Sequence, residues 1–193
     1  DAFQHRRINR DLDIVLLDAL EPFGFEHVFP RGTLREPLAG LHRADVVALS
    51  RADMLAPPER EAVRRRALEL VPEALWLEIT HAPKCLLQYD GRQTPIETLR
   101  GRRVAAFCGL GNPAGFRHTL DACGCRPVAL REFPDHHPYT PADVDSLQAW
   151  ADAPDVDAVV CTHKDLVKLA ANRLGRRPLW AVAIDIRFLT GQP

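Results

Sequence analysis

Short apolar runs alternate with more polar segments along the whole chain. Residues 12–17 (LDIVLL) and 44–49 (ADVVAL) are compact apolar runs, which is typical of parallel strands buried on both faces. A third short strand is predicted over residues 75–80. Residues 57–70 begin at a proline and carry Glu and Arg where solvent is expected, so we predict a helix there. The first part of the chain is therefore predicted to be α/β.

The pattern changes over residues 81–101, which contain two prolines and an Asp90-Gly91 turn. Residues 84–88 and 93–96 have the length and the intervening turn that a small hairpin needs. We interpret this stretch as a β-hairpin-like linker between two domains.

Strands and helices alternate again beyond the linker. Strands are predicted over residues 104–108, 127–133, 156–161 and 179–186, and helices over residues 113–122, 141–151 and 165–173. Such alternation predicts parallel sheets that are covered on both faces. The predicted fold class is α/β, with a first domain at residues 1–80, the linker at 81–101 and a smaller second α/β domain at 102–193.

Composition narrows the function classes. The chain has 193 residues, 46% of them hydrophobic, and a formal net charge of −1, so no global field favours nucleic acid or an anionic membrane. No apolar run approaches the length of a membrane span. The five cysteines are odd in number, and Cys108 and Cys161 lie in apolar runs, which indicates reduced thiols rather than a disulfide framework.

Two polar motifs flank the first predicted strand, which itself ends at Asp18. The segment DAFQHRR opens the chain, and RGTLREP occupies residues 31–37 of a long loop. A carboxylate such as Asp1 can hold a metal that bridges nucleotide phosphates, although a frayed terminal aspartate is equally expected. Arg35 can clamp a phosphate, with Glu36 orienting it or reaching the metal. The alternative is a surface ion pair of little energy.

Three further motifs follow strands in the second domain. The segment GLGNP at residues 109–113 can bind an anion through its backbone N–H groups, although a tight strand-to-helix turn explains it better. Asp135-His136-His137 can share a proton near neutral pH, or it can order the loop before the helix at Pro141. Lys164-Asp165 lies where α/β sheets place ligands, and it can equally form a structural salt bridge.

Taken in order, these motifs resemble the tetraacyldisaccharide 4'-kinase (lipid A 4'-kinase) family. That family carries an Asp-Asp-Gly-Phe-Gln-His-Arg motif, an aspartate-ended strand and a Pro-x-Gly-x-Leu-Arg-Glu-Pro loop. The glycine segment, the Asp-His-His segment and the stretch THKDLVKL at residues 162–169 continue the similarity. Ala2 stands where the family usually has Gly, and His163 where Glu is common. The sequence contains no GxxxxGK[ST] motif, so we expect an N-terminal truncation that removes the phosphate-binding loop (P-loop).

The resemblance implies that residues 1–80 are the later half of a P-loop-type three-layer nucleotide-binding domain. It implies an ATP-dependent kinase that phosphorylates the 4'-hydroxyl of a tetraacylated glucosamine disaccharide, the lipid A precursor, with ATP and Mg²⁺ as cofactors. This chain alone is expected to be inactive. The implied location is the cytoplasmic face of the bacterial inner membrane, with peripheral membrane contact through a segment upstream of this chain. Nucleic acid is not an expected partner.

Residue roles follow from the same resemblance. We expect His136 and Asp135 to be catalytic, with the histidine assisting a catalytic aspartate that lies upstream of this chain. The expected substrate-binding residues are Gln4, His5 and Arg35, and the expected metal ligands are Asp1 and Glu36. Residues that bind ATP stay unassigned because the P-loop is absent.

Two other function classes remain open at this point. The Asp135-His136-His137 segment alone suggests a metal-dependent phosphoesterase, for which Asp18 and Asp53 are further candidate ligands. The absent P-loop suggests a non-catalytic remnant or a binding module.

Overall fold

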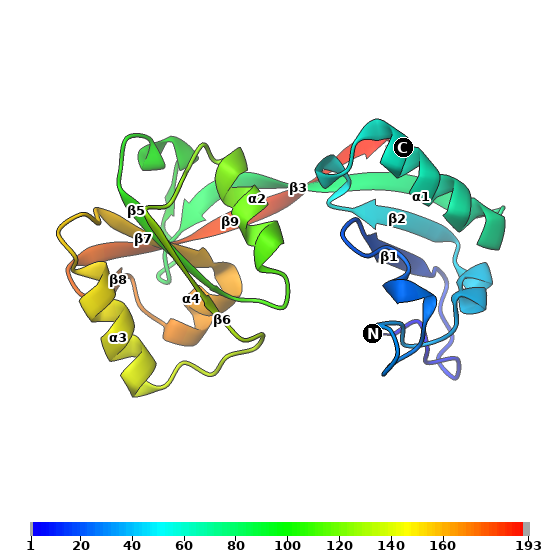
Figure 1. The fold of residues 1–193 in the computed structure, drawn as a ribbon, viewed down its shortest axis with the longest axis horizontal. Helices are drawn as coiled ribbons and strands as arrows, with labels where there is room; N and C mark the ends of the chain where they lie inside the picture. The colour runs from blue at the N-terminus through cyan, green and yellow to red at the C-terminus, as the bar shows by residue number, and fades with distance from the viewer. Residues whose placement is uncertain (1, 191–193) are drawn as a thin grey trace. The chain divides into compact units, whose positions relative to one another are not determined.

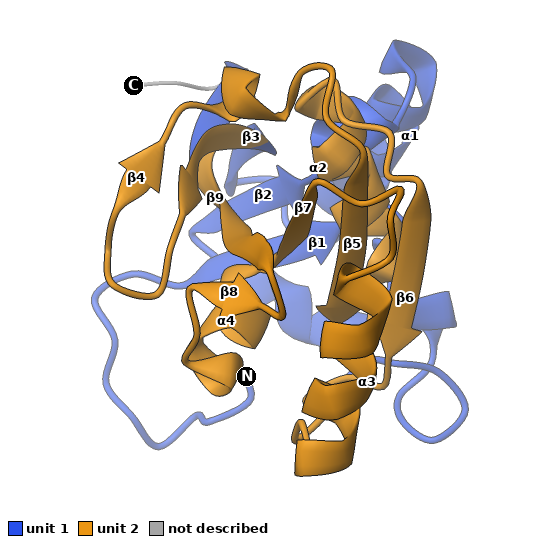
Figure 2. Cartoon of the chain, turned by 90° about the vertical axis from the view of Figure 1, so that its left-hand side faces the viewer, with its two compact units in different colours: residues 1–81, 186–193 blue, residues 82–185 orange. Residues whose placement is uncertain are grey.

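The computed structural model describes residues 2–190, which form an α/β fold with two compact units (Figure 1). The first unit comprises residues 2–81 and 186–190 of the described chain, and the second comprises residues 82–185 (Figure 2). The boundaries fall inside two long neighbouring strands, β3 (Leu75–Leu87) and β9 (Arg177–Thr190). Each of these strands therefore contributes residues to both units.

The first unit is built on three parallel strands in the order β1-β2-β3. Its elements are β1 (Ile14–Asp18), η1 (Gly24–Glu26), η2 (Leu38–Arg43), β2 (Val46–Ser50), η3 (Ala52–Met54), α1 (Pro57–Leu70) and the first part of β3. Its core includes Leu17, Val47 and Leu49 from the strands, with Ala67 and Val71 at the end of α1. All five residues of β2 are buried, as expected for the middle strand.

The sequence predicts the bounds of α1 correctly because its start is encoded locally. Pro57 and Pro58 occupy its first turn, where a missing N–H costs nothing. The Glu59 carboxylate accepts a hydrogen bond from the backbone N–H of Ala56 at 2.7 Å and thereby satisfies a free donor at the helix start.

The second unit contains four parallel strands in the order β9-β7-β5-β6. Its remaining elements are β4 (Gln93–Thr94), η4 (Ile96–Leu99), β5 (Val104–Gly109), α2 (Pro113–Ala122), β6 (Ala129–Phe133), α3 (Pro141–Ala151), β7 (Ala158–Thr162), α4 (His163–Leu169) and β8 (Arg173–Leu174). The short strands β4 and β8 pair antiparallel with β3 and β9.

Strand β5 is buried on both faces, as the run of apolar residues predicts. Val104, Ala106 and Cys108 pack in one core cluster, which also contains Phe116 and Leu120 of α2. The alternate residues of β5 pack in a second cluster together with residues of α3. The two helices therefore cover opposite faces of the sheet in this unit, and the predicted α/β class is confirmed.

Some predicted bounds were wrong for identifiable reasons. The helix predicted over residues 165–173 runs from His163 to Leu169, since Thr162 caps its start and Ala170 adopts a left-handed conformation at its end. The strand predicted over 75–80 continues to Leu87, where its end pairs with β4 in the predicted hairpin. Within residues 2–190, no helix is long and apolar enough to cross a membrane.

Candidate functional site

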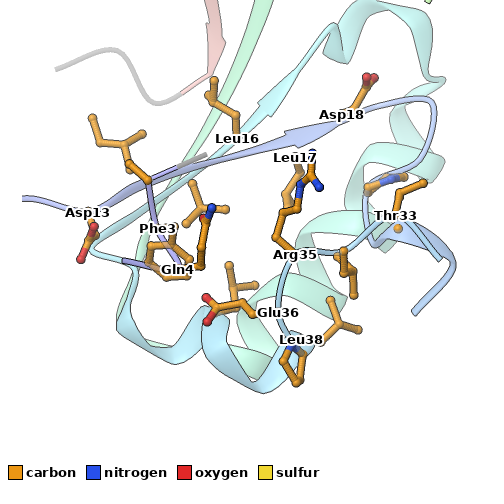
Figure 3. A pocket seen from close by; sticks show the side chains of 18 of the residues that line it. Phe3, Gln4, Asp13, Leu16, Leu17, Asp18, Thr33, Arg35, Glu36 and Leu38 are labelled. Atoms are coloured by element: carbon orange, nitrogen blue, oxygen red, sulfur yellow. The ribbon is translucent and has the colours of Figure 1, made fainter. Parts of the chain in front are cut away.

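The N-terminal motif and the RGTLREP loop come together in the first unit around a cavity of about 710 Å³ (Figure 3). Its wall combines the N-terminal segment, β1 and the loop before η2, and it includes Phe3, Gln4, Asp13, Leu16, Asp18, Arg35, Glu36 and Leu38. Tertiary structure thus places Gln4, Arg35 and Glu36, three of the predicted site residues, around one space. His5 is exposed and does not line the cavity, and Asp1 lies outside the described residues.

The two ends of this site present different chemistry. In Figure 3 the Arg35 side chain extends toward β1 near Leu17, and Leu16 projects from the other side of that strand. Leu16 also lines the cavity and is 63% exposed. Asp18 lies at the end of the same strand. The lining of the cavity therefore offers both an apolar surface and a guanidinium group that can bind an anion.

Glu36 is an ion-pair partner in the structure. One carboxylate oxygen lies 2.5 Å from Arg43 Nη2, and the other lies 3.4 Å from Arg6 Nη2. Arg43 also donates to the carbonyl of Phe3 at 3.2 Å, and its guanidinium lies 4.3 Å from the centroid of the Phe3 ring. These contacts tie the loop of Glu36 to the N-terminal segment that carries Gln4.

The described residues do not by themselves fit a magnesium site. No group of three or more His, Cys, Asp or Glu side chains that could hold a metal occurs among residues 2–190. The Glu36 carboxylate, an expected ligand, faces two guanidinium groups. Asp18 and Asp53 likewise belong to no such group among the described residues.

A polar cluster lies at the carboxyl ends of β1 and β2, beside His81 in the middle of β3, and this grouping was not predicted. Both oxygens of Asp18 accept hydrogen bonds from Arg51, whose Nε lies 3.2 Å from Oδ1. Ser50 Oγ lies 3.4 Å from His81 Nε2. Burial, and next the charge of Arg51, lower the pKa of His81 below its usual value of 6.5. The available signal was that Asp18 and Ser50 each directly follow an apolar run, since neighbouring parallel strands place their carboxyl ends at one edge of a sheet.

In the second unit, the two adjacent histidines have different environments. The His136 side chain is 80% exposed, and its Nε2 lies 3.8 Å from Asp135 Oδ2. Its backbone is left-handed, with φ of 58°, which is uncommon for a residue other than glycine. Asp135 Oδ1 accepts the backbone N–H of His136 at 3.0 Å. Asp135 and His136 thus form an accessible pair.

His137, by contrast, is packed into its own loop. Its ring stacks on Phe133 with centroids 4.9 Å apart, and its Nε2 lies 3.0 Å from Asp143 Oδ2. Hydrogen bonds from the Thr140 side chain and backbone, followed by the one from His137, lower the pKa of Asp143 to about 2. His137 therefore orders the loop before α3.

The glycine segment packs against carboxylates of the protein itself. The N–H of Gly109 donates to Asp165 Oδ2 at 3.1 Å, and Asp165 is fully buried. This contact supports the interpretation of residues 109–113 as a tight strand-to-helix turn. Asp165 accepts from neutral donors, whereas the adjacent Lys164 is exposed, so the two residues of that motif have separate surroundings.

Comparison with known proteins decides the family. Residues 1–193 match the family model described as LpxK, tetraacyldisaccharide-1-P 4'-kinase. The chain belongs to this family. It is 48% identical to the tetraacyldisaccharide 4'-kinase of Anaeromyxobacter sp. (strain K), in an alignment covering 99% of this chain and 51% of that protein. It is 36% identical to the one from Desulfatibacillum aliphaticivorans, covering 100% and 52%.

The fold agrees with this membership. A crystal structure of LpxK from Aquifex aeolicus, described as an "apo" form in complex with ATP, matches with a TM-score of 0.64 and 29% identity. The match covers 97% of this chain and 51% of that one. The family resemblance drawn from the motifs is therefore confirmed, and the chain spans about half the length of the relatives it matches.

Proposed function

We propose that this chain forms part of an ATP-dependent kinase that phosphorylates the 4'-hydroxyl of a tetraacylated glucosamine disaccharide, the lipid A precursor. The observation that carries the proposal is the family match over all 193 residues. The names of the relatives support the reaction, and the ATP complex of the Aquifex aeolicus protein supports ATP as the phosphoryl donor.

The cavity of the first unit is proposed as the place where the acceptor substrate binds. Arg35 and Gln4 line it, and a guanidinium suits a sugar phosphate because it can donate two parallel hydrogen bonds. The exposed aliphatic side chain of Leu16, which also lines the cavity, suits an acyl chain. The role of His5 in substrate binding rests on its motif alone.

Asp135 and His136 are proposed to take part in proton transfer. Phosphorylation of a sugar hydroxyl releases a proton, and a carboxylate with a pKa of about 4 is a weak base for it. The exposed imidazole of His136 lies 3.8 Å from the Asp135 carboxylate, so the two groups can share a proton. The main catalytic base is proposed to be an aspartate of the intact enzyme that is not present in this chain.

Mg²⁺, with Asp1 and Glu36 as ligands, also remains a proposal, since it needs groups beyond those described here. When bound, the ion would neutralise charge on the transferred phosphoryl group. Within the residues described, Glu36 has a second role that needs no metal: it holds Arg43 and Arg6 beside the cavity. Peripheral contact with the cytoplasmic face of the inner membrane is proposed from the family alone.

A chimera tests the function. In the kinase of Anaeromyxobacter sp. (strain K), this chain would replace the half that it matches. With ATP, Mg²⁺ and the lipid disaccharide, the chimera should turn over on the order of 1 per second or faster. The chain alone should show no kinase activity because it has no GxxxxGK[ST] loop to hold the β- and γ-phosphates.

Two results would contradict the proposal. A folded chimera without kinase activity would indicate a non-catalytic remnant or a binding module. Manganese-dependent phosphate ester hydrolysis by the chain alone would favour the phosphoesterase alternative.

A further inference from the structure

We propose that Asp165 is a positioning residue that anchors two loops of the second unit and thereby places His136. The two loops are the glycine loop, residues 109–113, and the histidine loop, residues 134–139. A role of Asp165 in catalysis rests on the proposed kinase function. Its role in holding the two loops rests only on contacts within the second unit.

Asp165 accepts hydrogen bonds from three separate segments. Its Oδ2 accepts from the N–H of Gly109 at 3.1 Å and from the hydroxyl of Thr162 at 2.6 Å. Its Oδ1 accepts from the hydroxyl of Tyr139 at 3.0 Å. These donors lie at the end of β5, at the end of β7 and in the loop between β6 and α3. Because β6, β5 and β7 are neighbours in that order, one carboxylate connects the carboxyl ends of three adjacent strands.

The glycine loop is shaped to accept these carboxylates. A Cβ atom at Gly109 would lie 3.1 Å from Asp165 Oδ1 and 3.3 Å from the Tyr139 hydroxyl. A Cβ atom at Gly111 would lie 3.1 Å from Asp135 Oδ2. Asp165 therefore packs against one glycine of the loop and Asp135 against the other. The Asp135 carboxylate thus lies directly against the glycine loop, beside Gly111.

The contacts lead from this anchor to His136 by two routes. On one route, the glycine loop packs beside Asp135, whose Oδ1 accepts the backbone N–H of His136. On the other, Tyr139 holds the end of the histidine loop three residues beyond His136. The left-handed backbone of His136 is costly for a non-glycine residue and persists only where its surroundings hold it. Asp165 contributes to that support through its bonds to Tyr139 and to Gly109.

The chemistry of Asp165 suits an anchor better than a reacting group. It is fully buried, so it cannot touch a substrate. Burial and the nearby Asp165 carboxylate raise the pKa of Tyr139, so its phenol stays protonated and remains a donor. Three hydrogen bonds that converge on one buried carboxyl group favour a fixed geometry.

The second unit contains a matched control at the opposite ends of the same strands. The Asp157 carboxylate accepts the backbone N–H of Arg103 at 2.9 Å, just before β5 begins. It also forms an ion pair with the Arg103 side chain at 2.9 Å. Asp157 and Asp165 each fix one backbone amide beside β5, but only the second lies next to the histidine loop.

The test is amide hydrogen exchange on the 193-residue chain, which requires no kinase activity. Asp165→Ala should speed exchange of the Gly109 and His137 amides at least about tenfold, while the Arg103 amide keeps its rate. Asp157→Ala should speed exchange of the Arg103 amide and leave the rates of the Gly109 and His137 amides unchanged. Unchanged exchange at Gly109 and His137 would overturn the proposal, as would equal acceleration of every amide in the second unit.

Tyr139→Phe covers the case in which Asp165→Ala does not fold. It removes one hydrogen bond to Asp165 and keeps the buried carboxylate. We expect faster exchange at His137 with Gly109 still protected, and no change at His137 would contradict the anchor. In the chimera, the same variant should lower kcat about tenfold or more and leave the KM for ATP unchanged. A changed KM with an unchanged kcat would contradict a role in placing His136.

Discussion

His137 Nε2 lies 3.0 Å from Asp143 Oδ2, and this contact gives two adjacent histidines different surroundings. Asp143 belongs to the capping box at the start of α3, together with Thr140, so the bond connects His137 to the start of that helix. Stacking on Phe133 also holds the His137 ring in place. The neighbouring His136 keeps its imidazole in solvent. The exposed histidine is therefore available for proton transfer, and the packed one supports the loop.

The first prediction follows from this difference. In the chimera, His136→Ala should lower kcat by roughly 10²-fold, the usual size of an acid–base contribution, and leave ATP binding unchanged. His137→Ala should mainly lower the melting temperature. A pH–rate profile of each variant beside the parent distinguishes the two roles. If the His136 variant keeps both its rate and a near-neutral ionisation, His136 is not in the proton path.

The second prediction concerns acid stability and Asp143. Its pKa is about 2 in the folded protein, below its ordinary value of 3.8, because Thr140 and then His137 donate hydrogen bonds to the carboxylate. The unfolded chain therefore binds the proton first as the pH falls. The stability that Asp143 contributes is present above pH 3.8 and is lost as the pH falls through about 2.

In the Asp143→Asn variant, the free energy of unfolding should fall less steeply as the pH drops from 3.8 to about 2. Urea unfolding between pH 5 and pH 2 measures the effect, with Asp145→Asn on the exposed face of the same helix as the control. An equal change of slope in both variants would mean that the Asp143 network does not produce the pH dependence.

The third prediction concerns Glu36. Glu36→Ala leaves Arg43 without its carboxylate partner, and two other nitrogens of Arg43, Nε and Nη1, are already buried without a hydrogen-bond partner among the described residues. We expect a loss of about 1–3 kcal/mol in unfolding free energy. The exposed pair of Glu61 and Arg64 provides the control, and Glu61→Ala should cost below about 0.5 kcal/mol.

Measuring kcat in the chimera then distinguishes a role of Glu36 in binding metal or substrate from a purely structural role. If Glu36 binds metal or substrate, Glu36→Ala should lower kcat severely at a temperature where the variant is fully folded. An unchanged kcat with a lowered melting temperature would indicate a purely structural ion pair.

The fourth prediction compares two glycines of one loop. Gly109→Ala places a Cβ 3.1 Å from Asp165, which three hydrogen bonds hold in place, so we expect a cost of about 1–3 kcal/mol. Gly111→Ala approaches the half-exposed Asp135, which can move aside, so its cost should stay within about 0.5 kcal/mol. Urea unfolding measures both. Equal costs would show that Asp165 is no more rigidly held than Asp135.

Local signals in the sequence predicted most secondary structure. The helices α1, α2 and α3 run over the predicted residues because a proline in the first turn and, for α2 and α3, a capping side chain mark each start. Strand β5 was predicted because its residues are apolar on both faces. The hairpin with β4 was predicted, but the continuity of β3 from Leu75 to Leu87 was missed because its pairing with β9 depends on residues distant in sequence.

The sequence by itself determined the α/β class, the order of the motifs and the family, since these depend on local patterns and on residue identity along the chain. Only the tertiary structure decided which side chains meet. It brought Gln4 and Arg35 to one cavity, and it assigned His137 rather than His136 to Asp143. The physical reason is that burial and hydrogen-bond partners depend on how distant segments pack, and adjacent residues in one sequence motif can face different neighbours.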